Sequence, residues 1–157
     1  MNSIPFTGQT ELIFMSFNDG DLLLESIRQC CREHAIESGI ILSGVAAIKT
    51  AKVHYIQHTE YPPTDITHAV ALPMEMTSIS GIIIDFEPHV HIGLVNGINN
   101  NFGGHLEEGT CIAYRGELAI MKCPDADLTR SENKKGISVL VQKSKHFPLP
   151  PKDLLHE

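Results

Sequence analysis

The sequence has little positive charge. Twelve lysines and arginines face 19 aspartates and glutamates, and the formal net charge is −7. Duplex binding depends on basic side chains that neutralise phosphates, so this balance disfavours nucleic acid as a direct partner. The densest basic stretches, residues 133–135 and 143–146, contain no Gly-Arg-Pro core of a minor-groove hook. We expect both stretches to be solvated.

Long apolar runs are also missing. No segment approaches the roughly 20 residues that a membrane-spanning helix needs. Residues 1–8 have neither the basic region nor the apolar segment of a secretory signal. We therefore expect a cytoplasmic protein without membrane contact.

The four cysteines form no recognisable framework, because no Cys-x-x-Cys occurs. Cys30 and Cys31 are adjacent in a predicted helix, where neighbouring side chains point about 100° apart and a mutual bridge would be strained. In a reducing compartment we expect reduced, partly buried thiols. Cys111 could also approach a metal, because it is near His105 in sequence.

The size and composition predict one soluble domain. The chain has 157 residues and a mass of 17.3 kDa, with 42% hydrophobic and 20% charged residues. These values suit a single domain over residues 1–157 with a proper core. We place that core at residues 11–121. A polar loop, a last strand and a proline-rich tail would follow in residues 122–157.

The hydrophobic pattern predicts an α+β fold with one major helix. Residues 11–17 are expected to form the first strand, and the helix to run from Asp21 until Gly39 stops it. Short strands are expected at residues 40–43, 45–56, 66–72, 74–80, 82–85, 90–94, 111–114, 118–121 and 137–141. Residues 124–135 are expected to be polar and mobile, and residues 147–151 to form an extended tail. The strands together predict one large, mostly antiparallel sheet.

Three histidines carry most of the functional information. His89 and His91 would project from one face of a strand, because successive side chains alternate faces. A turn-rich stretch separates them from Gly103-Gly104-His105, and its midpoint is residue 98. A hairpin folded there would bring His105 beside His91. The pattern matches a three-histidine metal site whose fourth position is open.

A second interpretation of the histidines is structural. The chain contains 9 histidines, enough for some to fall close together by chance. His-x-His alone is a weak signal, so an ordinary polar sheet face remains an alternative to a metal or catalytic role.

Several ordered blocks resemble one known family. These blocks are residues 20–27 (GDLLLESI), 38–47 (SGIILSGVAA), 75–81 (EMTSISG), 89–91 (HVH) and 103–109 (GGHLEEG). In order and spacing they are similar to the PPC domain, the plants-and-prokaryotes conserved domain, over roughly residues 11–121. The hairpin tip departs from the family, because residues 98–101 replace a shorter Asp-Gly-type turn.

The resemblance implies a fold, an assembly and a site. It implies a large antiparallel sheet, a homotrimer, and a metal site formed by His89, His91 and His105. Plant relatives join the domain to AT-hook motifs, and many prokaryotic members carry a DNA-binding label. No Arg-Gly-Arg-Pro hook occurs here, so DNA binding rests on family analogy alone. In the plant relatives a glutamate-containing segment corresponding to residues 75–81 is linked to partner contact, whereas here those residues could simply be a core strand.

The site permits three classes of function. Zn²⁺ accepts histidine nitrogens at about 2.0–2.1 Å, and an open fourth position could hold a water whose pKa falls towards ~7, as in hydrolases or lyases. The acid–base candidates are Glu108 first, then Glu107, Asp85 and Glu87. A purely structural metal and a non-enzymatic trimeric interaction module are the alternatives. The sequence has no Ser/His/Asp order, phosphate loop or dinucleotide fingerprint, so no reaction can be named.

Overall fold

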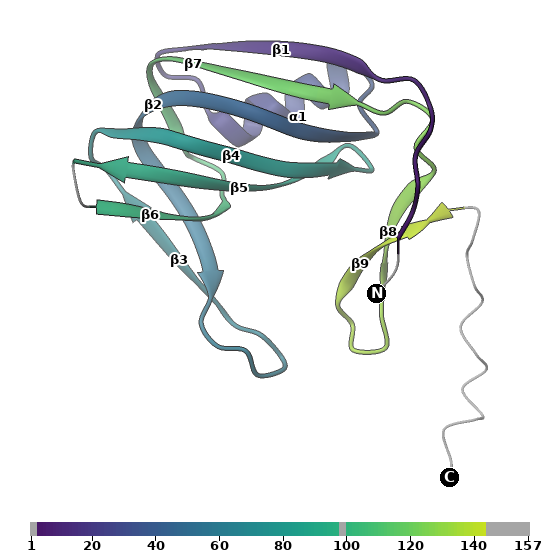
Figure 1. Cartoon of the computed structure of the whole chain (residues 1–157). Helices are drawn as coiled ribbons and strands as arrows, with labels where there is room; N and C mark the ends of the chain where they lie inside the picture. Colours follow the sequence, from purple (N-terminus) through teal and green to yellow (C-terminus); the bar gives the residue numbers. More distant parts are fainter. Residues whose placement is uncertain (1–2, 98–99, 144–157) are drawn as a thin grey trace.

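The fold is a seven-stranded antiparallel sheet with one helix against one face, as a computed structural model of residues 3–97 and 100–143 shows (Figure 1). The elements are β1 (Glu11–Asn18), α1 (Leu23–Glu33), β2 (Ser38–Ile56), β3 (Asp65–Val70), β4 (Met74–Ile84), β5 (Glu87–Asn96), β6 (Asn100–Leu106), β7 (Cys111–Lys122), β8 (Leu128–Glu132) and β9 (Ser138–Gln142). The order in the sheet is β1-β7-β2-β4-β5-β6, with β3 also paired to β2, and every pairing between described strands is antiparallel. The predicted α+β class is confirmed.

Strand β2 organises the sheet because it is 19 residues long. Its first part pairs with β7 along one edge and with β4 along the other. Its last part pairs with β3 and, through Val53 and His54, with β6. The path from β2 through β4, β5 and β6 therefore returns to β2. This closure brings residues far apart in the sequence onto neighbouring strands.

The expected break at Gly44 does not occur. The strand continues through this residue, and the nearest irregularity is a shift of its register with β7 between Ile41 and Ser43. A Cβ at Gly44 would lie 2.9 Å from the carbonyl oxygen of Glu117. The glycine therefore permits a close approach of β7 and does not end the strand.

Two further pairs of short strands are in fact single strands. β4 runs unbroken through Gly81, and β7 through Gly116, because each is paired with neighbours on both sides. Residues 124–135 are not simply a polar loop, since β8 lies within them and pairs with β9. The last predicted strand is confirmed as β9. The proline-rich tail at residues 147–151 lies outside the described residues.

The helix ends earlier than Gly39, at Glu33, for a local reason. Ala35 has φ +50°, its N–H donates to the carbonyl of Arg32, and the N–H of Ile36 donates to that of Cys31. This is the hydrogen-bond pattern of a Schellman motif, with alanine where glycine is usual. The burial of Ile36 completes the motif, because the residue after the turn packs into the core.

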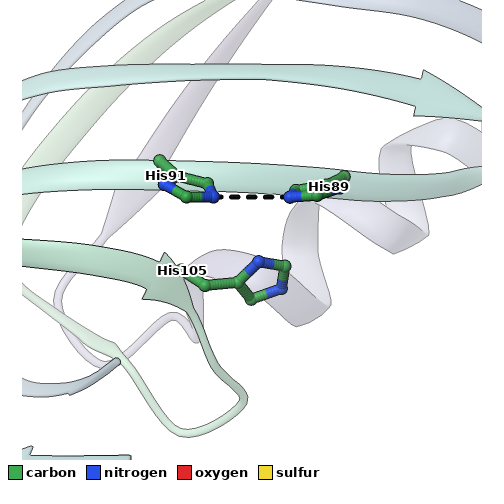
Figure 2. A group of neighbouring side chains, drawn as sticks. All are labelled: His89, His91 and His105. Carbon is green, nitrogen blue, oxygen red and sulfur yellow. Dashed lines mark hydrogen bonds between the residues drawn. The ribbon is translucent and has the colours of Figure 1, made fainter. Parts of the chain in front are cut away.

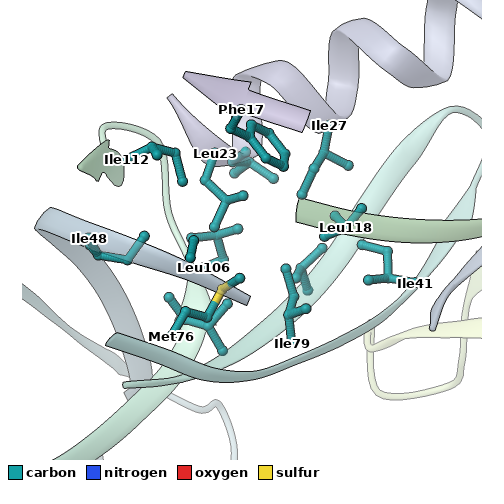
Figure 3. Close-up of a cluster of buried hydrophobic side chains, with 14 of the residues drawn as sticks. Phe17, Leu23, Ile27, Ile41, Ile48, Met76, Ile79, Leu106, Ile112 and Leu118 are labelled. Carbon is teal, nitrogen blue, oxygen red and sulfur yellow. The ribbon is translucent and has the colours of Figure 1, made fainter. Parts of the chain in front are cut away.

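The core lies between α1 and the inner face of the sheet (Figure 3). The helix contributes five buried side chains: Leu23, Leu24, Ile27, Cys30 and Cys31. In β5 the alternation is complete, because Val90 and Ile92 are buried while His89 and His91 are exposed. In the described part of the chain, the outer face of the sheet has no helix cover. Among the described residues, no helix is both long and apolar enough to cross a membrane.

The two glycines before His105 are required by close strand packing. A Cβ at Gly103 would lie 2.2 Å from the carbonyl oxygen of Ile92 in β5, and one at Gly104 would lie 2.5 Å from that of His54 in β2. No side chain fits at such distances from backbone. The Gly-Gly pair therefore lets β6 lie close to both neighbours.

We expect Gly103→Ala to lower the free energy of unfolding by about 1–3 kcal/mol, because the methyl group must push β6 away from β5. Urea denaturation of the variant and the wild type measures this difference. The control is Asn101→Ala, an exposed position on the same strand, which should change stability by less than about 0.5 kcal/mol. Equal stability of Gly103→Ala and the control would contradict the packing argument.

Candidate metal centre

The β5–β6 hairpin brings the three predicted histidines together (Figure 2). His91 and His105 are direct cross-strand partners, as the expected hairpin requires. His89 lies two residues from His91 on the same face of β5. The hairpin tip itself, residues 98–99, lies outside the described residues.

The donor atoms lie close enough together to share one ion after small shifts of the side chains. The Nε2 atoms of His89 and His91 are 3.3 Å apart, and one donor nitrogen from each of His89, His91 and His105 lies within 4.8 Å of the others. Two nitrogens that each bind one zinc at about 2.0–2.1 Å in a tetrahedron lie roughly 3.3–3.4 Å apart. The three imidazoles could therefore hold a divalent metal with little rearrangement.

The site favours neutral imidazoles, which is the form that binds metal. Burial lowers the pKa of His105 to about 4, and the positive charges that His54, His89 and His91 would carry add to the effect. Burial, followed by the charge of Arg130, lowers the pKa of His89. The lone pairs of both rings are thus free at neutral pH.

A fourth histidine, His54, was not identified from the sequence. It lies on β2 directly opposite His105, and the two rings stack with centroids 4.3 Å apart. Its Nδ1 is 2.5 Å from Oε1 of Glu107, so a second group of possible ligands is formed by His54, His105 and Glu107. His54 is in no local motif, and only the β2–β6 pairing places it here.

The acidic candidates have different surroundings. Arg28 of α1 forms ion pairs with both Glu87 and Glu108, the first at 2.5 Å. Asp85 accepts a hydrogen bond of 2.8 Å from the Thr129 hydroxyl. Glu107 contacts His54 at 2.5 Å, and Asp65 of β3 lies 3.8 Å from the other ring nitrogen of His54.

A cavity of about 490 Å³ adjoins His89 and His91. Its other lining residues come from β2, β4 and the β8–β9 ribbon: Ile40, Ile41, Ser80, Gly81, Ile82, Arg130 and Leu140. The exposed side of the histidine cluster therefore opens onto a largely apolar space with one arginine. This volume is in the usual range for small-molecule sites.

The cysteines take no part in either ligand group. All four are free, and the Cys111 thiol donates to the Gly20 carbonyl at 3.4 Å. Burial raises the pKa of Cys31 to about 12, so this thiol stays protonated in the core. The proposed approach of Cys111 to a metal at His105 is thus not observed.

The fold and the cluster define an α+β domain with a candidate metal centre on the open face of its sheet. The chain belongs to the Plants and Prokaryotes Conserved (PCC) domain family, whose model matches residues 5–124. The predicted family is confirmed.

Solved structures support the same fold. A plant- and prokaryote-conserved (PPC) protein from Pyrococcus horikoshii is 26% identical with a TM-score of 0.72, and the match covers 90% of this chain and 98% of that one. A metal-containing protein from Archaeoglobus fulgidus is 20% identical with a TM-score of 0.75, covering 90% and 100%. A candidate DNA-binding protein from Bacteroides thetaiotaomicron is 18% identical with a TM-score of 0.72, covering 84% and 92%. The similarities at 20% and 18% identity show a shared fold and no more.

A curated relative contains a matching segment within a much longer chain. The bifunctional protein GlmU of a Synechococcus strain is 22% identical over 111 residues, which is 71% of this chain. The match covers 17% of that relative.

We expect the metal-free protein to lose stability as the pH falls from 6.5 towards about 4, partly through His105. Its pKa is lower in the folded state, so the unfolded chain gains the proton first and acid favours unfolding. Thermal midpoints measured across this range should fall less steeply for His105→Asn than for the wild type. His68→Asn, an exposed histidine on β3, is the control and should retain the wild-type slope. If the thermal midpoint depends on pH identically in all three proteins, the lowered pKa of His105 is contradicted.

Proposed function

We propose that this protein is a homotrimeric metal-binding protein whose His89, His91 and His105 hold one divalent ion, zinc by preference. The observation that carries the proposal is the convergence of three imidazole nitrogens on one exposed face. Three histidines match zinc sites that keep an open position. The similarity to a protein described as metal-containing supports it.

Surrounding residues would orient the ligands. Close backbone packing at Gly103 and Gly104 fixes the position of His105 between β5 and β2. The Glu107 carboxylate contacts one nitrogen of His54, whose ring stacks against His105 and restricts its rotation. Partners of this kind commonly fix a ligand imidazole and alter metal affinity.

We expect purified wild type to contain zinc and a His89→Ala/His91→Ala variant to contain far less, because two of three ligands are lost. Elemental analysis of both proteins measures the metal. His58→Ala/His68→Ala is the matched control, since it removes two histidines outside the ligand groups. Bound metal should also be released as the pH falls through the histidine range. Equal zinc in the ligand variant and the control would disprove the site.

The uncovered outer face of the sheet supports the homotrimer. Leu12 and Phe14 of β1 and Leu42 and Val45 of β2 are exposed, and Phe14 is 78% exposed. A groove of about 440 Å³ runs between these strands and β7. Closed assembly through one repeated interface would cover such a surface.

We expect light scattering at low micromolar concentration to give about three times the 17.3 kDa chain mass. Phe14→Asp should shift the protein towards monomer, because it places a charge in the apolar surface. Asn101→Asp, an exposed position on β6 outside this groove, is the control and should leave the mass unchanged. A monomeric wild type would contradict the trimer.

A metal-dependent hydrolase or lyase acting on a small molecule is the second candidate. The cavity beside His89 and His91 favours it, because a purely structural ion needs no such space. When bound, zinc would supply a Lewis acid. Glu107 with His54 is the acid–base pair closest to the cluster, whereas Glu108 would act only after release from Arg28. A high-resolution map with four protein ligands and a filled cavity would exclude this candidate.

Direct DNA binding is not favoured, although a similar structure carries that description. With a net charge of −7 per chain, we expect no measurable binding to A·T-rich duplex near physiological salt. Fluorescence anisotropy with a labelled duplex measures it. Tight, sequence-dependent binding would instead support a DNA-binding function.

A further inference from the structure

Arg130 is held in place by a ribbon that is anchored to the sheet. It lies on β8, whose partner is β9. The neighbouring Thr129 donates to Asp85 in the β4–β5 turn. Lys143, just after β9, forms ion pairs with Asp85 and Glu37. The guanidinium is therefore presented by an anchored strand, which makes it suitable for selective recognition.

No carboxylate lines the cavity of Arg130 in the described part of the chain. The other residues that line its cavity are aliphatic, small or histidine. Among the residues that the structure describes, none forms a hydrogen bond or an ion pair with its side chain. Arg28, Lys49 and Lys122 each pair with an acidic residue, and what sets Arg130 apart from the other unpaired cations among the described residues, such as Arg115, is its place in a largely apolar cavity beside two histidines. In a chain with an excess of acidic residues, an arginine left without one inside a cavity suggests a ligand anion.

The walls of the cavity define the rest of the ligand. Ile40 and Ile82 lie on its β2 and β4 sides, and Leu140 on its ribbon side. These side chains favour a short hydrocarbon body, because burying apolar surface contributes about 25 cal/mol per Å². His89 and His91 line the same cavity, so a bound molecule would lie beside the candidate metal centre.

We propose that this cavity binds a small carboxylate with a short apolar body, and that Arg130 recognises its carboxylate group. The planar guanidinium can donate two parallel hydrogen bonds to the two carboxylate oxygens. The isoleucine and leucine walls hold the hydrocarbon, which places the body of the ligand next to the histidines. The site would thus take organic acids as substrates or ligands. This inference adds a ligand class to the proposed metal centre and, for any catalytic role, rests on that function.

A monocarboxylate fits better than a phosphate ester. Among the described residues, Arg130 is the one lysine or arginine that lines the cavity, and a phosphate dianion would keep a net negative charge beside it. The protein is also negatively charged overall, which penalises each further charge. Amines are disfavoured because Arg130 would repel them.

The test uses hexanoate as the probe and the full-length protein in its native assembly. Titration calorimetry compares hexanoate, the isosteric hexanamide and inorganic phosphate, on both zinc-loaded and metal-free protein. We expect hexanoate to bind most tightly, and Arg130→Gln to weaken it by about ten- to one-hundred-fold, as expected for the loss of hydrogen bonds to a charged group. Arg130→Lys should recover only part of the affinity, since lysine cannot form the two-pronged contact. Arg115→Gln, an exposed position on β7, should bind as wild type.

The outcomes separate this proposal from the metal proposal. Unchanged zinc content in Arg130→Gln together with weaker hexanoate binding supports a role in ligand recognition. If the protein holds no zinc, Arg130-dependent binding to the metal-free form still supports the inference while the metal function fails. Equal hexanoate affinity in wild type and Arg130→Gln, no hexanoate binding by the wild type, or tighter binding of phosphate or hexanamide would overturn it.

Discussion

The candidate site depends on how closely β6 lies against the two strands beside it. Gly103 faces a carbonyl of β5 and Gly104 a carbonyl of β2, at distances that exclude any side chain. His105 therefore stands between His91 on one strand and His54 on the other. A wider spacing would separate these rings, so a backbone constraint controls the geometry of the imidazoles.

The acidic residues around the cluster each have a partner, and burial favours the neutral form of His89 and His105. Arg28 pairs with Glu87 and Glu108, and Glu107 contacts His54. Burial lowers the pKa of His105 well below its ordinary value. The pKa of His89 is also lowered by burial, so these two ligands are ready to bind a metal without first losing a proton at neutral pH.

The histidines share the open face of the sheet with exposed apolar side chains, while α1 covers the opposite face. One surface thus combines the features of an assembly interface with those of a ligand site. The β8–β9 ribbon, which extends beyond the end of β7, contributes Arg130 to the cavity (Figure 1).

Local patterns in the sequence determined the helix, the alternation of β5 and the hairpin that pairs His91 with His105, because each depends on residues close together in the chain. They also indicated the family. His54 and Arg130 came only from the tertiary structure, since β2–β6 pairing and the position of the ribbon join segments that are distant in sequence. The continuity of β2 through Gly44 was likewise decided by strands on either side. A glycine in the sequence does not tell whether a strand ends there or a neighbouring strand approaches closely, because both situations favour a residue without a Cβ.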